Sequence, residues 1–519
     1  MDVKIGRALI SAWRKDGIAE FGGFLASRDV EVLSTGGTAK CLREAGVEVR
    51  DVADVTGFPE MMDGRVKTLH PRVHGGLLFR RDKDSHVAAA EEHGIPRIDL
   101  LVVDLYPFEA VSSQPDATRA DCVEMIDIGG PAMIRAAAKN HAHVLVVTDP
   151  GDLPAIRSEM EERDGCVSEA TRSAMAAKAY ARTGAYDATI ASYLTEERFP
   201  ERLVVPLELK AVTRYGENPH QPGAVYVTPA TGESTVARAA AHEGSKELSY
   251  NNYLDASGAW DVVRGQSQPA VAFIKHRNPC GAAIDEDLLV AFRAAHEGDP
   301  LSAFGGIVAV NRTVDGALAA EIADPKKFLE VIVAPAFTDE AVEAIRTGAK
   351  WGKNARLLAL GEGGSPASGV LELRSIGGGM LVQERDEPDP DVEFQCVTQR
   401  EPDDREIADL RFAWDVVRNV TSNAIVFVNG RKLVGCGAGQ MSRVDSVELA
   451  SKKSAELAKG AVMASDAFFP FPDGILAAAE AGVSAVVQPG GSIRDDQIIK
   501  ACDEAGLAML LTHRRHFRH

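Results

Sequence analysis

The amino-acid sequence predicts an α/β protein built from more than one domain. Short apolar segments alternate with helix-like segments through the first part of the chain, a pattern typical of βαβ units in a parallel sheet. The chain has 519 residues, which is long for one domain when about 150 residues is the usual size. Hydrophobic residues make up 45% and charged residues 26% of the sequence. This composition is that of an ordinary globular protein with a large core.

The first domain is expected to cover residues 1–200 as a parallel sheet with helices on both faces. The pattern predicts strands at 6–11, 30–34, 98–106 and 143–149, and helices at 18–28, 38–46, 153–163 and 171–194. The last of these helices would close the domain. Residues 199–212 contain proline and mixed charge without a clear period, which predicts a linker.

The remainder, residues 201–519, is expected to form two further α/β lobes at about 205–370 and 375–519. Strand and helix signals resume in 270–335 and again in 423–513. Two segments rich in glycine, proline and acidic residues, 360–369 and 385–393, separate the lobes.

Charge and cysteine usage argue against several classes of function. The formal net charge is −19, from 76 acidic and 57 basic residues, which argues against a nucleic-acid-binding surface. The seven cysteines form no CxxC pair, so they indicate neither a zinc site nor a disulfide framework. No signal-peptide pattern and no apolar run of about 18 residues is found. We therefore expect a cytoplasmic enzyme that binds neither nucleic acid nor membrane.

One candidate catalytic pair follows an apolar run in the second half of the chain. Residues 271–274 read as a buried strand that ends in Lys275 and His276, two groups that can hold or move a proton. Open α/β sheets usually place their chemistry at the carboxyl ends of strands. Asn278 and Pro279 are expected to turn the chain there. The alternative is a solvated strand end without a chemical role.

Residues 33–38 follow a predicted strand and open a predicted helix. The glycines let backbone N–H groups approach a ligand, and the helix N-terminus adds partial positive charge, so the segment has the outline of a phosphate cradle. A tight strand-to-helix turn would need the same glycines. Residues 63–71, DGRVKTLHP, add basic side chains suited to an anion, or form a solvated basic loop.

A second glycine-rich loop follows at residues 127–131. Asp127 precedes a helix on which Arg135 and Lys139 share one face at a spacing of four residues. An Asp at such a loop and a Lys on the helix suit a reaction that needs proton removal and anion stabilisation. Asp127 could equally cap the helix.

A series of motifs runs in order from one end of the chain to the other. They are STGGTAK (34–40), VTGFPEMMDGRVKTLHPRVHGGLL (55–78), LYPFEA (105–110), IDIGGPAMIRAAAKNHA (126–142), RYGENPHQ (214–221), KELSYNNYLDA (246–256), IKHRNPCGAA (274–283), DPLSAFGGIVA (299–309), SNAIV (422–426), GAGQMSRVDS (437–446), SDAFFPFPDG (465–474) and QPGGSIRDD (488–496). Together they resemble the bifunctional purine-biosynthesis family that joins AICAR (phosphoribosylaminoimidazolecarboxamide) formyltransferase to IMP cyclohydrolase. The resemblance implies an N-terminal methylglyoxal-synthase-like domain and two cytidine-deaminase-like lobes that lack zinc.

The resemblance implies ring closure of formyl-AICAR to IMP, without a cofactor, in the first domain. The backbone of residues 35–38 would hold the 5′-phosphate, while Lys67, Tyr106, Asp127 and Lys139 would be the catalytic groups around the formamido and carboxamide groups. The implied binding residues are Lys15, Thr35, Gly36, Gly37, Thr38, Arg65, Val66, Thr68 and Ile128.

For the two lobes, the resemblance implies formyl transfer from 10-formyltetrahydrofolate, a co-substrate, to the 5-amino group of AICAR. His276 would be the general base, and Lys275 would stabilise the oxyanion. The implied binding residues are Arg214, Tyr215, Asn252, Gly305, Glu330, Asn423, Arg443, Phe468, Asp473, Ser492, Ile493, Arg515 and Phe517. A homodimer is implied, no catalytic metal is expected, and a structural monovalent cation is left open.

This chain departs from the family pattern beside the first site. The family usually reads SVSDKTG where residues 11–17 read SAWRKDG, so Trp13 replaces a small hydroxyl residue and Arg14 replaces Asp. Arg14 could restore affinity for an anion, and Trp13 could crowd the pocket. Asp104 replaces the usual Asn, and Arg182 replaces a usual His.

Two other readings stay open at this point. In one, the chain is a formyltransferase only, and its first domain is a non-catalytic nucleotide-binding module. In the other, it is an enzyme of the cytidine deaminase type, which requires metal-bound water and for which the sequence offers no paired-cysteine ligand set.

Overall fold

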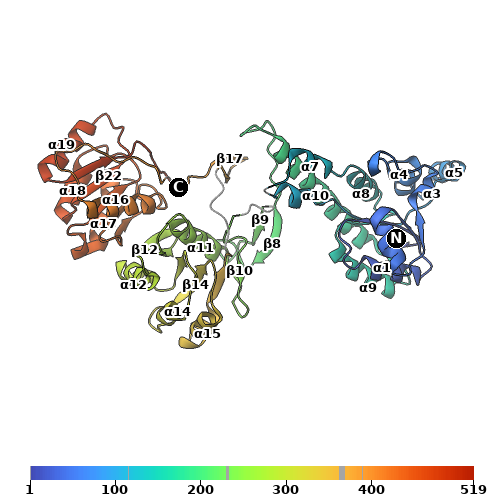
Figure 1. Cartoon of the computed structure of the whole chain (residues 1–519), viewed down its shortest axis with the longest axis horizontal. Coiled ribbons are helices and arrows are strands. Elements are labelled where there is room, and N and C mark those ends of the chain that lie inside the picture. Colours follow the sequence, from blue (N-terminus) through green and yellow to red (C-terminus); the bar gives the residue numbers. More distant parts are fainter. Residues whose placement is uncertain (1, 115, 229–232, 362–368, 389) are drawn as a thin grey trace. The chain divides into compact units, whose positions relative to one another are not determined.

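The structure is a computed structural model that describes residues 2–519 except 115, 229–232, 362–368 and 389. The chain divides into two compact units, the first running to Glu208 with a short return at 228–230, and the second comprising residues 209–227 and 231–519 (Figure 1). Each unit is described by itself. No helix among the described residues is both long and apolar enough to cross a membrane.

The first unit is built on a parallel sheet of five strands in the order β4-β3-β2-β5-β6. The strands are β2 (Arg7–Ala12), β3 (Glu31–Ser34), β4 (Val49–Asp51), β5 (Leu100–Asp104) and β6 (Leu145–Val147), and a small pair is formed by β1 (Val3–Lys4) and β7 (Cys166–Val167). The strands predicted at 6–11, 30–34, 98–106 and 143–149 are therefore confirmed, with shorter bounds for the last two.

Helices cover both faces of this sheet. Leu100 and Val102 of β5 pack in one core with α1 (Ile18–Ala26), α2 (Gly36–Glu44) and α9 (Leu153–Glu162). Leu101 and Val103 point the other way, into a core with α4 (Pro71–Leu78), α8 (Gly129–Lys139) and α10 (Glu169–Leu194). The remaining helices of this unit are α3 (Val52–Thr56), α5 (Asp84–Glu92), α6 (Phe108–Ser112) and α7 (Arg119–Glu124), with 3-10 turns η1 (Met62–Gly64) and η2 (Pro150–Asp152).

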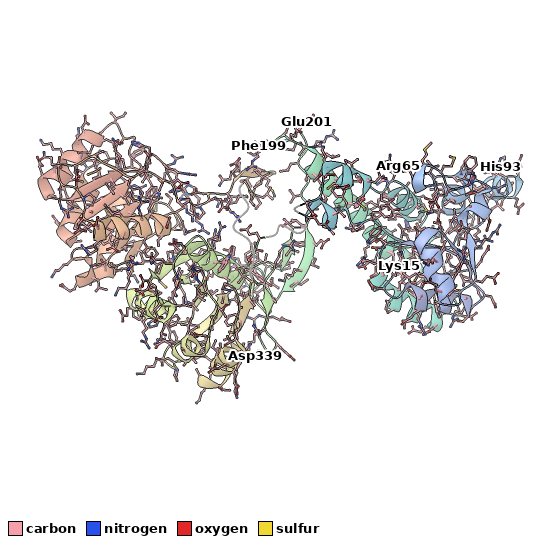
Figure 2. All side chains as sticks on the ribbon, in the orientation of Figure 1. Lys15, Arg65, His93, Phe199, Glu201 and Asp339 are labelled. Carbon is pink, nitrogen blue, oxygen red and sulfur yellow. The ribbon has the colours of Figure 1, made fainter. Side chains whose placement is uncertain are left out.

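The segment after α10 is irregular up to residue 207, in agreement with the predicted linker, and Phe199 and Glu201 lie in it (Figure 2). The end of that prediction is wrong, because β8 (Glu208–Thr213) forms a two-stranded sheet with β9 (Gly223–Val227). The break predicted at 360–369 falls mostly outside the described residues. Between it and the second break, β16 (Leu371–Ile376) and β17 (Gly379–Glu384) form a separate hairpin.

The second unit contains two six-stranded sheets with the same topology. Their orders are β10-β15-β14-β13-β11-β12 and β18-β23-β22-β21-β19-β20. The first lobe contains β10 (Ala240–Ala241), α11 (Tyr250–Val263), β11 (Ala270–Lys275), β12 (Asn278–Ile284), α12 (Leu288–Gly298), α13 (Pro300–Ala303), β13 (Gly306–Val310), α14 (Gly316–Ile322), β14 (Leu329–Ala334), α15 (Asp339–Gly348), η3 (Gly352–Asn354) and β15 (Arg356–Ala359).

The second lobe contains β18 (Gln395–Cys396), α16 (Asp404–Val417), β19 (Ile425–Val428), β20 (Leu433–Gly437), α17 (Arg443–Ser454), η4 (Ala455–Ala458), β21 (Val462–Ser465), α18 (Asp473–Ala481), β22 (Ala485–Gln488), α19 (Asp495–Ala505) and β23 (Ala508–Leu511). One apolar core joins the lobes, since Ala259 of α11 and Leu410 of α16 pack in the same cluster as Ile274 and Val426 from the two sheets. The amide of Ile284 also donates to the carbonyl of Arg431 across the lobes (3.2 Å). The predicted α/β class is confirmed throughout.

Candidate functional site: a cavity in the first unit and a Lys-His turn in the second

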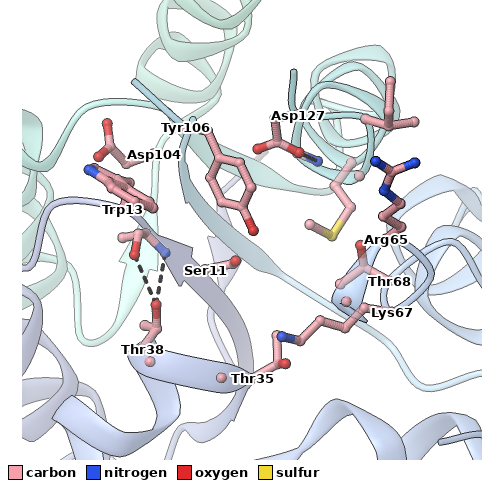
Figure 3. A pocket seen from close by; sticks show the side chains of 18 of the residues that line it. Ser11, Trp13, Thr35, Thr38, Arg65, Lys67, Thr68, Asp104, Tyr106 and Asp127 are labelled. Atoms are coloured by element: carbon pink, nitrogen blue, oxygen red, sulfur yellow. Dashed lines mark hydrogen bonds between the residues drawn. The ribbon is translucent and has the colours of Figure 1, made fainter. Parts of the chain in front are cut away.

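A cavity of about 540 Å³ opens in the first unit where strands β2, β3 and β5 end (Figure 3). Parallel strands present their carboxyl ends at one edge of a sheet, which is where α/β folds bind ligands. The segments that line the cavity are 11–15, 35–38, 64–68, 104–106 and 123–133. Three of these segments, 35–38, 64–68 and 123–133, are those in which the sequence predicted a phosphate cradle, a basic loop and a second glycine-rich loop.

One end of the cavity is suited to an anion. Helix α2 begins at Gly36, and its N-cap residue Thr35 makes no side-chain capping hydrogen bond, so the first amides of the helix have no partner from that side chain. The ammonium of Lys67 lies over this turn, because a Cβ added to Gly36 would be 3.0 Å from its Nζ. Glu60 pairs with Lys67 at 3.0 Å. A phosphate bound here would meet the amide donors of α2, and the Lys67 ammonium would lie beside it, within reach of the rest of the substrate.

Tyr106 and Asp127 supply titratable groups to the same cavity, and the Tyr106 hydroxyl points into it (Figure 3). Burial raises the pKa of Asp127, and amide N–H groups of Gly130 and Tyr106 oppose that rise. Burial also raises the pKa of Tyr106, and the nearby charges of Asp127 and Glu60 add to it. Tyr106 is therefore protonated at neutral pH and can donate a hydrogen bond to a developing negative charge.

A residue of α10 that the sequence did not single out, Tyr186, holds the Asp127 loop in place. Tyr186 of α10 is buried, accepts a hydrogen bond from the amide of Asp127 (2.9 Å) and donates one to the carbonyl of Met125 (3.0 Å). Tyr186 lies 59 residues further along the chain, so no local signal marks this contact. Asp127 lines the cavity and accepts from the amide of Gly130 (2.8 Å), but it is not the N-cap of α8, because Ile128 occupies that position.

Gly129 and Gly130 leave room for two polar side chains at the start of α8. A Cβ at Gly129 would lie 2.8 Å from Oγ1 of Thr68, and one at Gly130 would lie 2.4 Å from Oδ2 of Asp127. Neither distance is tolerated by real side chains. The pair Gly129-Gly130 therefore lets the Asp127 carboxylate and the Thr68 hydroxyl approach the start of α8.

Most of the implied ring-closure residues line this one cavity. They are Lys15, Thr35, Gly36, Gly37, Thr38, Arg65, Lys67, Thr68, Tyr106, Asp127 and Ile128. Val66 and Lys139 are not among the residues that line the cavity. The start of α8 reaches the cavity, whereas Lys139 is the last residue of that helix. There Lys139 is suited to interact with the helix dipole. The catalytic roles stay predictions.

In the second unit, Lys275 ends β11 as predicted, and its Nζ donates to the carbonyl oxygens of Phe304 (3.2 Å) and Gly305 (3.0 Å). The predicted turn at Asn278 and Pro279 is wrong. The chain turns two residues earlier, at His276 and Arg277, whose φ angles are 50° and 65°. Two consecutive left-handed residues make the tight turn that suits a two-residue hairpin. Pro279 is tolerated in β12 because that strand lies at the sheet edge and beside a register shift.

The other implied formyl-transfer residues fall into groups in the two lobes. In the first lobe, Asn252 donates to Glu330 (3.1 Å), and the Arg214 guanidinium lies over the Tyr215 ring (4.9 Å). In the second lobe, Arg443 donates to Asn423 Oδ1 (2.7 Å). Phe468, Asp473, Ser492, Ile493, Arg515 and Phe517 lie in later segments of that lobe, and Arg515 covers Phe517 at 4.3 Å.

A direct contact links the Lys-His turn to the second lobe. Asn278 Oδ1 accepts from the amide of Thr421 (2.9 Å), while its Nδ2 donates to the carbonyl of His276 (3.2 Å). Thr421 lies two residues before Asn423 in sequence. Among the residues that the structure describes, no group of three or more His, Cys, Asp or Glu could hold a metal ion.

The fold and the cavity together define a multidomain α/β protein of the enzyme class, whose first unit carries a cavity with a helix N-terminus and basic side chains in its lining. Residues 17–132 match the family model described as MGS-like domain, and residues 137–453 match that of the AICARFT/IMPCHase bienzyme. The chain therefore belongs to the AICARFT/IMPCHase bienzyme family and is a bifunctional enzyme, so the resemblance seen in the motifs is confirmed.

Full-length relatives agree with this assignment. The chain is similar to the bifunctional purine biosynthesis protein PurH of Dinoroseobacter shibae (52% identical, over 100% of this chain and 99% of the relative). It is also similar to the protein of the same name from Ruegeria pomeroyi (51% identical, over 99% of each chain) and from Rhodopirellula baltica (48% identical, over 100% of this chain and 99% of the relative).

Proposed function

We propose that this chain carries out the last two steps of IMP synthesis, with ring closure in the first unit and formyl transfer in the second. The observation that carries the first assignment is the convergence of the α2 N-terminus, Lys67, Tyr106 and Asp127 on one cavity. The substrates are AICAR and 10-formyltetrahydrofolate, the intermediate is formyl-AICAR and the product is IMP. The reactions take place in the cytoplasm.

In ring closure, the α2 N-terminus and Lys15 bind the 5′-phosphate of formyl-AICAR. The carboxamide nitrogen attacks the formyl carbon while Lys67 and Tyr106 stabilise the negative charge on the formyl oxygen. Asp127 removes a proton from the attacking nitrogen, and Tyr106 donates one to the formyl oxygen, which becomes a hydroxyl. The hydroxyl takes up a second proton and leaves as water, while a ring nitrogen loses its proton and the carbon–nitrogen double bond forms. Because the two reacting groups belong to one molecule held in place, proximity supplies much of the rate.

In formyl transfer, the 5-amino nitrogen of AICAR attacks the formyl carbon of 10-formyltetrahydrofolate. This nitrogen is a poor nucleophile, so His276 takes its proton as the new bond forms. Lys275, held in place by the carbonyl groups of residues 304 and 305, stabilises the oxyanion. The carbon–nitrogen bond to the folate then breaks, and the folate nitrogen takes up a proton.

A substitution at the turn separates the two reactions. His276→Ala is expected to abolish formyl transfer and to leave ring closure of supplied formyl-AICAR unchanged, because His276 and the cavity belong to different units. Both are followed by absorbance on full-length protein. Loss of both activities in a folded variant would refute the two-site assignment.

The alternative, in which the first unit only binds nucleotide, is tested with the native protein. Formyl-AICAR is supplied without folate, and IMP formation is followed. Absence of IMP under conditions where formyl transfer proceeds would leave the first unit as a binding module.

The protein acts as a homodimer in this proposal. The hairpin β16–β17 forms a sheet of its own, and Ile376, Met380 and Leu381 are at least half exposed. A lone two-stranded hairpin is marginally stable in water, so these apolar side chains are suited to a second copy of the chain. Such a dimer would bring the separated groups of binding residues to shared formyl-transfer sites.

Leu381→Arg is therefore expected to shift the protein from dimer to monomer in sedimentation velocity and to lower formyl transfer while ring closure persists. Leu457→Arg is the control, since Leu457 is also exposed but lies in η4. A dimer that is equally stable in both variants would contradict the hairpin contact.

A further inference from the structure

Two of the residues that depart from the family pattern form an ion pair with each other. Arg14 donates to the Asp104 carboxylate from its backbone amide (2.8 Å), from Nε (3.1 Å) and from Nη2 (2.7 Å). The Asp104 side chain is only 5% exposed. A forked pair with one buried partner is more specific in geometry than an exposed pair. Asp104 is also the last residue of β5, which pairs with β2 and β6 inside the sheet.

The ion pair with Asp104 accounts for most of the contacts that the Arg14 guanidinium makes. Its guanidinium also reaches Asp149 (3.3 Å), and Lys178 lies 3.5 Å from Asp149 on the other side. The hydrogen bond with Asp104 raises the pKa of Arg14. Arg14 is thus held between two carboxylates, and the idea that it restores affinity for an anion is not supported by its contacts.

The pair holds the loop that forms one wall of the cavity. The amide of Trp13 donates to the carbonyl of Asp104 (3.1 Å), and the indole meets the Tyr106 ring edge-on at 5.4 Å (Figure 3). Lys15, on the same loop, turns its Nζ back to the carbonyl of Trp13 (3.1 Å) and to Thr38 Oγ1 (3.3 Å). Trp13, Lys15 and Tyr106 all line the cavity.

We propose that Arg14 and Asp104 form a clamp that positions Trp13 and Lys15 in the ring-closure site, and that the Trp13 indole contacts the bound purine nucleotide beside Tyr106. This inference rests on the proposed ring closure in this cavity. A small hydroxyl residue at position 13 would leave this side of Tyr106 open to water, whereas the indole covers it. Arg14 and Asp104 are positioning residues, and Trp13 is the substrate contact.

The clamp is tested by a double-mutant cycle that introduces the usual family residues, using full-length Arg14→Asp, Asp104→Asn and the double variant. Arg14→Asp places two carboxylates together and is expected to lower kcat/KM for formyl-AICAR by about tenfold or more. Asp104→Asn keeps an acceptor for Arg14 and is expected to cost about threefold. The double variant is expected to recover to within about threefold of the native protein.

Formyl transfer by the same preparations serves as the folding control, since neither residue belongs to the second unit. A double variant whose loss equals the product of the two single losses would overturn the clamp. Equal ring closure by all four proteins would overturn it as well.

The Trp13 contact is tested by kinetics and by fluorescence. Trp13→Phe keeps an aromatic edge against Tyr106 and is expected to stay within about threefold in kcat, whereas Trp13→Ala is expected to lose about tenfold. Titration with IMP is expected to change the tryptophan emission of the native protein and to leave that of Trp13→Phe unchanged. The other tryptophans, at 260, 351 and 414, lie in the second unit.

The two assays separate this inference from the proposed function. Ring closure without any Trp13-dependent change in emission would overturn the Trp13 contact and leave the function standing. An IMP-dependent change in Trp13 emission in a protein that never closes the ring would overturn the proposed function and support the contact.

Discussion

Tyr186→Phe tests whether a residue outside the cavity sets the position of Asp127. The hydroxyl is buried, donates to the Met125 carbonyl at 3.0 Å and accepts from the Asp127 amide at 2.9 Å. Burial raises the pKa of Tyr186 to about 12, so the side chain is a neutral donor at any pH used for assay. The substitution removes only this hydroxyl and keeps the ring that packs against Phe108.

Two hydrogen bonds at about 1 kcal/mol each predict a loss of about 2 kcal/mol. If the Asp127 loop bears all of that loss in the transition state, kcat for ring closure falls by up to about 30-fold. The assay follows IMP formation from formyl-AICAR, and urea denaturation of the full-length protein, read by the loss of ring closure, reports stability. Formyl transfer is expected to stay unchanged.

Tyr180→Phe is the matched control. Tyr180 lies on the same helix, is 41% exposed, and its hydroxyl reaches the Arg135 carbonyl only at 3.5 Å. It is expected to lose less than about 0.5 kcal/mol, as surface substitutions usually do. Native-like ring closure and stability in Tyr186→Phe, or equal losses in both variants, would refute the proposed support of Asp127.

Two further outcomes follow from the geometry. Burial raises the pKa of Asp127 in the folded state, so its contribution to stability is greatest in acid and is lost as pH rises through the folded-state pKa. Asp127→Asn should therefore abolish ring closure yet raise the free energy of unfolding at pH 7. A gain in stability that persists at a pH below about 3.9 would contradict this explanation. Asn278→Ala removes the contacts to Thr421 and His276 and should lower formyl transfer by about tenfold with ring closure unchanged. Asn429→Ala, in the β19–β20 turn, serves as the control. An equally large loss of formyl transfer in the control would argue for a general effect of lobe stability.

Periodicity and turn chemistry were sufficient to place most elements of the first unit. The helix predicted at 171–194 is α10 (Glu169–Leu194), and the glycine-rich turn at residues 35–38 does open a helix at the cavity. These features depend on neighbours within a few residues, so local sequence carries them. The turn after Lys275 was misplaced because Asn-Pro is a common turn signal. His276 and Arg277 take a left-handed conformation for which neither residue type has a marked preference.

The sequence by itself determined the α/β class, the candidate loops and, through its motifs, the family. Only the tertiary structure decided which of those loops meet: it brings Asp104 to Arg14 across 90 residues, Tyr186 to Asp127 across 59 and Thr421 to Asn278 across 143. Pairings at such separations depend on how strands and helices pack, and the charge or hydroxyl at each position has no local pattern to reveal its partner. For this reason Arg14, which the sequence offered as an anion ligand, is a structural partner of Asp104 in the folded chain.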